Sequence, residues 1–421
     1  MLKLIFISFI CISPLFAYLD PGSGSMLLYF IMGIFASLIY YFKGIIYKIR
    51  AFFSSGKADK GLRNLDGIDI LFYSEGGQYW NVYKPIIDEL EKLKIKSAYY
   101  TSKKNDPVFK TDYKYLKKAF IGEDLVSFTI LNNIKVKLFI TTTPQLDVMQ
   151  LKRSKDVEEY IHIFHSPIDT LMYKYFSFDF FDTVMCSGKY QIESIKELET
   201  IRKTKPKELL ETGLTYFDVL KERKEELEKT VVKNNKKTIL VAPTWKDGNL
   251  LEKYEIKPLV DLVNLGYEVI LRPHPQMYTS KKDIMQKIED EIKNISEISI
   301  DKNPSGEIAM SKADLLISDL SGIIFDFYFV FEKPVIVIKD VISKDGKEVD
   351  FSNKEPWEIE NLEKVATIID LEDIENIQKY IEIATLKTTQ QSIEEFRKAS
   401  LFNYGLAAKV ATNQIIAKIK G

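Results

Sequence analysis

Apolar residues are distributed unevenly along this chain, and the first 43 residues differ from all that follow. Between Lys3 and Lys43 the only charged residue is Asp20. The uncharged stretch 26–42 approaches the roughly 17–25 residues that a helix needs to cross a bilayer. A shorter apolar run at 4–17 follows a lysine, as in a signal peptide. This pattern predicts a membrane-associated N-terminal segment.

The charges that follow this segment indicate its orientation. Lys43, Lys48, Arg50 and Lys57 come directly after the second apolar run, and positive flanks of this kind stay in the cytoplasm. We therefore expect residues 1–60 to be a membrane anchor with a transmembrane helix at 26–42. The rest of the chain would then lie on the cytoplasmic side of a bacterial inner membrane. Two buried core helices are the alternative interpretation.

After residue 60 the pattern changes to short apolar runs that alternate with amphipathic segments of helical length. The predicted strands are Ile68–Tyr73, Ser97–Tyr100, Val126–Ile130, Val136–Ile140, Ile161–Phe164 and Thr183–Cys186, and the predicted helices are Val82–Leu93, Gln191–Arg202 and Phe217–Lys229. Strands separated by helices predict a parallel sheet that is covered on both faces.

A second series of strands begins after the polar stretch 221–237, which is typical of a solvated helix face or an interdomain linker. Its best members are Thr238–Ala242, Tyr267–Leu271, Asp314–Ile317 and Pro334–Ile338, and an amphipathic stretch, Ser392–Lys418, closes the chain. We expect an α/β protein with two Rossmann-like domains, 61–235 and 236–390, facing a cleft, and a C-terminal amphipathic helix within 391–421.

Composition narrows the chemistry. The chain has 59 Lys+Arg and 60 Asp+Glu, a net charge of −1, which argues against nucleic-acid binding. Two cysteines exclude a disulfide framework. Only three histidines are present, His162, His165 and His274, so a metal site with several histidine ligands is nearly excluded. We expect no metal and no cofactor.

A Ser/Gly turn in the second domain can hold an anion. Ser318, Asp319, Ser321 and Gly322 connect an apolar strand to an apolar helix that begins near residue 323. Such a turn presents free backbone N–H groups and the positive end of the helix dipole to a phosphate. A plain helix cap made by Asp319 or Ser321 is an equally simple interpretation.

Arg272 and His274 form a second candidate, in a loop stiffened by two prolines at the end of a strand. The guanidinium suits phosphate oxygens, and the imidazole can donate a hydrogen bond or a proton nearby. Because this loop lies in the same predicted domain as the Ser/Gly turn, we expect the two to form one phosphate site.

The third candidate is a histidine of the first domain. His165 falls at a strand end before Ser166, where it would face the cleft, whereas His162 lies within the strand and is expected to be a packed core residue. A histidine suits removal of a proton from an acceptor hydroxyl near pH 7. Asp169 can orient this imidazole, or it can cap a helix. Thr244 and Trp245, in another strand-end loop, are supporting candidates.

Together these segments resemble the CDP-glycerol glycerophosphotransferases of teichoic-acid synthesis. The segments that carry the resemblance occur in the family's order: His165 in its loop, Val241–Trp245, Arg272–Pro275 and Ile317–Phe327. The resemblance covers roughly residues 160–338. It implies a GT-B fold, in which two Rossmann-like domains face a cleft and the C-terminal one binds the CDP-linked donor.

The resemblance also implies an activity. Glycerol phosphate, or a related polyol phosphate, would pass from a CDP-linked donor to a hydroxyl of a cell-envelope glycan or lipid-linked acceptor, with release of CMP. His165 then corresponds to the base, Arg272 and His274 to the pair at the donor pyrophosphate, and the turn 318–322 to the phosphate cradle. The expected partners are the CDP-polyol, the acceptor and the membrane, with no nucleic acid; an oligomer stays open.

The chain departs from the family pattern on the acceptor side. The family often has a glycine after the first histidine, where Ser166 stands here, and its Gly-x-Pro-Arg-x-Asp segment appears as Gly213–Asp218 without the Pro-Arg. Two alternatives therefore remain. One is a GT-B glycosyltransferase or epimerase-like enzyme that uses a nucleotide sugar, and the other is a non-catalytic, membrane-tethered binding or assembly protein.

Overall fold

The computed structural model describes residues 65–123, 125–230, 236–245, 247–303, 305–339 and 344–420, together with Ile34 and Leu62. The chain divides into two compact units, Met1–Gly61 and Leu62–Gly421. The predicted anchor, 1–60, and its transmembrane helix, 26–42, lie outside the described residues except for Ile34. Within the described ranges, no helix has the length and apolar character that a membrane span requires.

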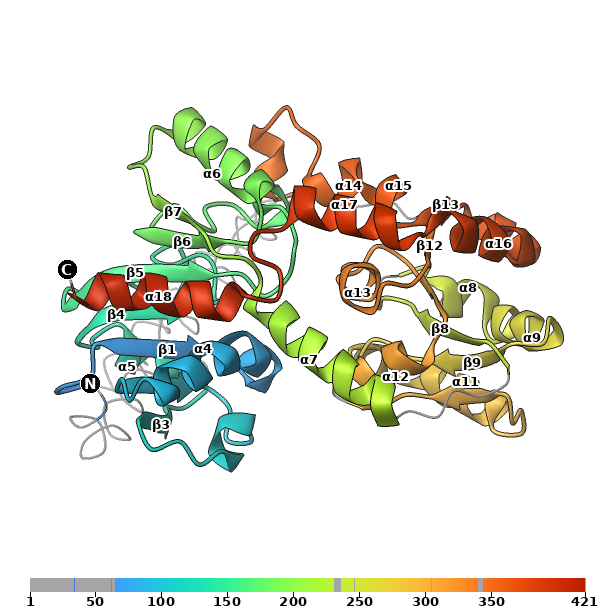
Figure 1. Cartoon of the computed structure of the whole chain (residues 1–421), viewed down its shortest axis with the longest axis horizontal. Helices are drawn as coiled ribbons and strands as arrows, with labels where there is room; N and C mark the ends of the chain where they lie inside the picture. Colours follow the sequence, from blue (N-terminus) through green and yellow to red (C-terminus); the bar gives the residue numbers. More distant parts are fainter. Residues whose placement is uncertain are drawn as a thin grey trace, which may run out of the picture. The chain divides into compact units, whose positions relative to one another are not determined.

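The first sheet has seven parallel strands in the order β3-β2-β1-β4-β5-β6-β7 (Figure 1). Its strands are β1 Ile70–Ser74, β2 Ser97–Thr101, β3 Leu116–Phe120, β4 Val136–Thr141, β5 Val157–Ile163, β6 Thr183–Cys186 and β7 Glu208–Glu211. The register places Tyr73 of β1 beside Thr141 of β4, and Thr141 beside His162 of β5. The residues that follow these three strands therefore meet at one edge of the sheet.

Helices cover both faces of this sheet. We call the sheet and these helices the N-terminal half. The helices are α4 Trp80–Lys92, α5 Leu125–Leu131, α6 Lys189–Arg202 and α18 Ala407–Lys420. One buried cluster lies between the sheet and α4 with α18, and the other between the sheet and α5 with α6. Two-sided burial explains why its central strands read as continuous apolar runs.

The second sheet, with its helices, forms the C-terminal half. It has six parallel strands in the order β10-β9-β8-β11-β12-β13. The strands are β8 Thr238–Ala242, β9 Glu268–Leu271, β10 Ile298–Ile300, β11 Leu315–Ser318, β12 Val335–Ile338 and β13 Thr367–Ile369. The chain reverses its direction of winding between β8 and β11, which is where open α/β sheets bind ligands.

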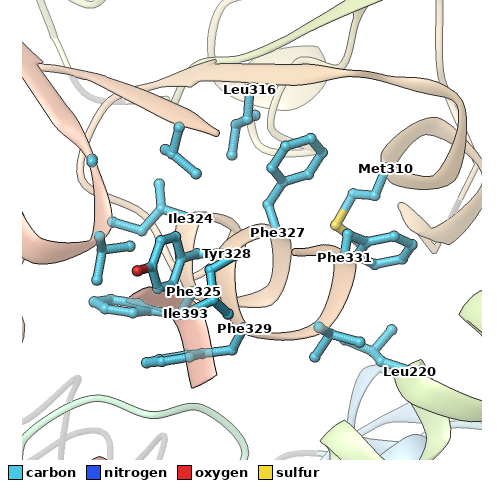
Figure 2. Close-up of a cluster of buried hydrophobic side chains, with 14 of the residues drawn as sticks. Leu220, Met310, Leu316, Ile324, Phe325, Phe327, Tyr328, Phe329, Phe331 and Ile393 are labelled. Carbon is cyan, nitrogen blue, oxygen red and sulfur yellow. The ribbon is translucent and has the colours of Figure 1, made fainter. Parts of the chain in front are cut away.

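The helices of the C-terminal half also form two layers. Its helices are α8 Leu250–Tyr254, α9 Lys257–Asn264, α10 Met277–Ser280, α11 Lys282–Ile292, α12 Glu307–Lys312, α13 Ile323–Asp326, α14 Trp357–Glu360, α15 Leu362–Val365, α16 Ile377–Lys387 and α17 Gln390–Ser400. Figure 2 shows the layer built around α13 and the π-helical turn Phe327–Phe331 that continues it, with Ile393 of α17 and Leu220 packed beside them. This aromatic core anchors the turn that precedes α13.

Two helices connect the halves. Helix α7, Thr215–Thr230, packs against α4 near its start and against α12 further along, so it bridges the two sheets. After α17 the chain returns to the N-terminal half, where α18 packs on α4 and α7. The predicted C-terminal stretch Ser392–Lys418 is therefore two helices, α17 and α18, because the chain turns back at Leu401–Leu406.

The prediction of an α/β fold with parallel sheets is confirmed. One strand prediction is wrong: Val126–Ile130 lies in helix α5. Its buried residues, Ser127, Ile130 and Leu131, follow a helical spacing, while Leu125 and Val126 are each 39% exposed. A five-residue apolar run does not distinguish a strand from a short half-buried helix.

Candidate functional site

A cavity of about 440 Å³ brings together loops from both halves. Its walls are formed by Gln78, Tyr79, Asn81, Val82, His165 and Tyr216 on one side and by Ala242, Pro243, Thr244, Arg272, Pro273, His274, Pro275, Ser305, Gly306, Glu307, Met310, Ser321, Ile323 and Asp326 on the other. Both candidate histidines, the candidate arginine and one serine of the turn therefore line the same cavity.

Arg272 and His274 follow strand β9 and are held by contacts of their own. The Arg272 guanidinium donates to the Asp301 carboxylate over 2.5 Å and to the Asn303 carbonyl over 2.9 Å. The Gln276 N–H donates to His274 Nδ1 over 3.1 Å. Because Nδ1 accepts this bond, a neutral His274 carries its proton on Nε2. Partial burial lowers the pKa of His274, while the negative charge of Asp319 opposes the shift.

In the Ser/Gly turn, Ser318 and Asp319 bond to the segment after β8, whereas Ser321 lines the cavity of about 440 Å³. The Ser318 hydroxyl donates to the Ala242 carbonyl over 2.6 Å, and the Asp319 carboxylate accepts from the Thr244 N–H over 2.9 Å and from its hydroxyl over 2.5 Å. These two side chains are buried and tie β11 to the loop after β8. Both residues also line a separate cavity of about 310 Å³, so their direct role at a phosphate stays a prediction.

Ser321 and Gly322 stand on the open side of the turn. Ser321 lines the cavity, and a Cβ on Gly322 would meet no atom within 4 Å. The N–H groups of Ile324 and Phe325 already bond to the carbonyls of Ser321 and Gly322. The other N–H groups at the start of α13 belong to the first turn, and a helix offers no acceptor within itself to the N–H groups of its first turn. This part of the turn can accept an anion.

Thr244 and Trp245 support the same region. Thr244 lines the cavity while its N–H and hydroxyl hold Asp319. The Trp245 ring lies 6.4 Å from the His274 ring, centroid to centroid, and is 46% exposed. Trp245 therefore flanks the cavity without lining it.

His165 follows strand β5 on the opposite wall of the cavity. Burial lowers the pKa of His165 to about 4, so the imidazole is neutral at pH 7 and its unprotonated nitrogen is a weaker base than that of a free histidine. Its Nδ1 atom is buried and has no hydrogen-bond partner among the described residues. His162 is fully buried among Phe164, Phe178 and Phe181, which agrees with the expected core role.

Asp169 does not orient His165. Its carboxylate accepts from the Leu171 N–H over 3.1 Å, which caps a short 3-10 helix at Thr170–Met172, and from the Trp357 N–H over 3.0 Å. Of the two interpretations of Asp169, capping is the one that the hydrogen bonds support. The bond to Trp357 joins residues 188 positions apart, and nothing in the local sequence indicates it.

The Gly213–Asp218 segment contributes Tyr216 to the cavity, and its two end residues pack against the C-terminal part of the chain. Gly213 has φ +96°, and a Cβ there would lie 2.4 Å from the Phe402 carbonyl, so the position requires glycine. The Asp218 carboxylate accepts from the Ala408 N–H over 2.8 Å at the start of α18. Asp218 is therefore a structural residue that ties α7 to the returning C-terminal helix.

Tyr79, Tyr216 and Asp326 are among the cavity residues that the sequence did not single out as candidates. The Tyr216 hydroxyl donates to the Asp326 carboxylate over 3.2 Å, and burial raises the pKa of Asp326 to about 7. Asp326 belonged to the quoted segment Ile317–Phe327 and could have been flagged as an acidic residue in an apolar helix. No group of three His, Cys, Asp or Glu suited to a metal occurs within the described ranges.

Comparisons with known proteins bear on the family and the fold of this chain. The family model described as CDP-Glycerol:Poly(glycerophosphate) glycerophosphotransferase matches residues 172–361. A relative, the teichoic acid poly(glycerol phosphate) polymerase of Bacillus spizizenii, is 30% identical over 160 residues, which cover 35% of this chain and 38% of the relative. These matches confirm the family resemblance. The chain thus matches about two fifths of that polymerase's length.

Solved structures support the fold. The wall teichoic acid polymerase TagF is similar with a TM-score of 0.59 and 16% identity over 92% of this chain and 98% of that chain. A putative UDP-N-acetylglucosamine 2-epimerase from Listeria monocytogenes is similar with a TM-score of 0.55 and 15% identity over 84% of this chain and 96% of that one. Both show a shared fold, and neither identity is high enough to carry an activity to this chain.

Proposed function

We propose that this protein is a GT-B transferase that moves glycerol phosphate, or a related polyol phosphate, from a CDP-linked donor to an acceptor hydroxyl, with release of CMP. The observation that carries the proposal is the shared cavity. Arg272, His274 and Ser321 line its C-terminal wall within the segment that the family model matches, and His165 faces them. The acceptor belongs to the cell envelope, as a glycan or a lipid-linked molecule, and the enzyme acts at the membrane's cytoplasmic face.

The residues have separate roles in the reaction. The donor pyrophosphate binds the C-terminal wall, where the Nε2–H of His274, the Arg272 guanidinium and the amides beside Ser321 offset its charge. His165, neutral at pH 7, removes the proton from the acceptor hydroxyl. The hydroxyl oxygen attacks the β-phosphorus, the bond from this phosphorus to the bridging oxygen breaks, and CMP leaves with that oxygen. No metal is part of this proposal.

The contacts of Arg272 also hold its side chain in position. Its guanidinium is already bound to the Asp301 carboxylate, a pair that is 15% and 8% exposed. This pairing holds the side chain on the cavity wall before a donor arrives. We expect the bound donor to share the guanidinium with Asp301 and not to displace that carboxylate.

The test uses the full chain in detergent micelles. CDP-glycerol should raise the melting temperature, because a ligand that binds the native state stabilises it, whereas UDP-N-acetylglucosamine should not. With CDP-glycerol and cell-envelope lipid extract, the protein should release CMP, and His274→Asn should abolish this release without lowering the melting temperature. Stabilisation by the nucleotide sugar alone, or no CMP release by folded protein, would refute the proposal.

A further inference from the structure

The loop between β1 and α4 is built rigidly and ends beside the catalytic histidine. The Ser74 hydroxyl donates to the Gly76 carbonyl over 2.7 Å and accepts from the Gly76 N–H over 3.3 Å. A Cβ on Gly77 would lie 2.5 Å from Pro107 Cδ, so the loop packs directly on the turn at Pro107. That turn is itself fixed, because the Asp106 carboxylate accepts from the Val108 N–H and the Thr101 hydroxyl.

This loop delivers Tyr79 to His165. Tyr79 ends the 3-10 helix Gly77–Tyr79, immediately before α4. Its ring meets the His165 imidazole nearly edge to face, with 5.0 Å between centroids and 64° between planes. Both side chains line the cavity. Aromatic pairs in this geometry attract each other beyond the area they bury.

His165 depends on such a contact for its orientation. A catalytic histidine is usually held by a hydrogen bond from its second ring nitrogen. Here the Nδ1 of His165 is buried without a partner among the described residues, and the candidate carboxylate, Asp169, is bound to Leu171 and Trp357 instead. Ring packing is the orienting interaction that the structure offers in its place.

We propose that Tyr79 is the positioning residue of His165, acting through edge-to-face packing and not through a hydrogen-bonded carboxylate. The proposal rests on the function proposed above for His165 in catalysis. The Tyr79 ring would hold one rotamer of the imidazole, which keeps Nδ1 in its buried position and the other nitrogen facing the acceptor hydroxyl. Because the surroundings of the two nitrogens then differ, a fixed rotamer also favours one neutral tautomer. A misplacement of about 1 Å can cost roughly 100-fold in rate, so such packing is sufficient to matter.

The charge around Tyr79 is consistent with this role. Burial, and then the negative charge of Glu75, raise the pKa of Tyr79, so the phenol stays protonated and the ring next to His165 stays neutral. Burial also raises the pKa of Glu75. Glu75 follows β1, and Thr143 follows β4, which lies between β1 and β5.

The experiment uses the small number of histidines. A full chain labelled with ¹³C and ¹⁵N in histidine gives one set of imidazole signals for each of its three histidines, and His165→Gln and His274→Gln assign these sets. Imidazole ¹⁵N shifts report the tautomer, and a pH titration reports the midpoint. The variants are Tyr79→Ala, Tyr79→Leu to keep volume without an aromatic edge, and Tyr79→Phe as the conservative variant. Phe109→Ala, which removes a 38% exposed ring from the adjacent turn, is the matched control.

We expect one His165 tautomer in the parent protein, in Tyr79→Phe and in Phe109→Ala, and a mixture in Tyr79→Ala and Tyr79→Leu. The His165 midpoint should rise by about one unit or more in Tyr79→Ala, because water enters beside the ring. In Tyr79→Ala and Tyr79→Leu, the kcat for CMP release should fall about 10- to 100-fold with the donor KM unchanged. Tyr79→Phe should keep the kcat of the parent protein.

An unchanged His165 tautomer and midpoint in folded Tyr79→Ala and Tyr79→Leu would overturn the positioning role. Loss of activity in Tyr79→Phe as great as in Tyr79→Ala would also overturn it, since the hydroxyl and not the ring would then be responsible. If the parent protein released no CMP, the proposed function would fail, while the tautomer measurement would still decide whether Tyr79 orients His165.

Discussion

Two buried carboxyl groups that join the halves should make this protein less stable as the pH rises. The Asp169 N–H donates to the Glu358 carboxylate over 3.0 Å, and the Trp357 N–H donates to the Asp169 carboxylate over 3.0 Å. The two residues are only 3% and 4% exposed. Burial, and then the negative charge of Asp169, raise the pKa of Glu358 from 4.5 to about 8.

The direction and size of the effect follow from this shift. Between pH 4.5 and 8 the unfolded chain has lost the Glu358 proton while the folded chain keeps it, so the folded state is favoured less as pH rises. Each pH unit in this window lowers the free energy of unfolding by about 1.4 kcal/mol. The contribution lost by pH 8 is therefore at most about 5 kcal/mol. The neighbouring charge of Lys347 opposes the shift of Glu358.

Glu358→Gln isolates this term, because the glutamine carbonyl can still accept from the Asp169 N–H but never ionises. Urea unfolding of the detergent-solubilised chain, followed by tryptophan fluorescence, should give nearly equal stability for parent and variant at pH 5. At pH 8 the variant should be more stable by about 2–5 kcal/mol. Glu360→Gln, an exposed neighbour on the same helix, is the control. A stability difference that does not grow between pH 5 and 8 would refute the reasoning.

Three further predictions concern the cavity and the contact between the halves. The acid limb of kcat/KM should lie near pH 4 and not near 6.5, because burial lowers the pKa of His165 to about 4; an acid limb above pH 6 would contradict this. Donor affinity, measured by calorimetry with CDP-glycerol, should fall as pH rises through about 7, where Asp326 ionises beside the anionic donor, and Asp326→Asn should remove that dependence. Arg202→Met should lower the free energy of unfolding by about 3–5 kcal/mol, because it leaves the Glu348 carboxylate, 1% exposed, and the Asp179 carboxylate, 11% exposed, without their cation; the double variant with Glu348→Gln should recover part of the loss.

The strands of this fold could be predicted where burial dominates the sequence. Thr238–Ala242 is buried at all five positions, and its bounds match the predicted ones. Glu208–Glu211, in contrast, lies at the edge of its sheet with both glutamates exposed, so it has no apolar run to detect. At Val126–Ile130 the opposite happens: a half-buried helix contains an apolar run of strand-like composition, and this run led to a wrong strand prediction.

The candidate site was predictable where chemistry follows a strand end. His165, Arg272 and His274 were predicted because each follows the carboxyl end of a parallel strand, His165 in the first sheet and the other two in the second, and all three line the cavity. The partners of these residues could not be found. Asp169 bonds with Trp357, far along the chain, and Tyr79 reaches His165 only through the packing of its loop on Pro107. Such pairings arise from tertiary packing and have no local sequence signal.

The family model covers the C-terminal wall of the cavity but not the residues Tyr79 and His165 of its N-terminal wall. The family model begins at residue 172, so it includes Arg272 and His274 on the donor wall but neither His165 nor Tyr79. The sequence also departs from the family pattern around His165, at Ser166. Under the proposed function, the donor binds the wall that the family model covers, and the acceptor meets the N-terminal wall. This division has a measurable consequence: changes at Tyr79 should alter transfer to the acceptor with donor binding intact, whereas changes at Arg272 should weaken donor binding whichever acceptor is supplied.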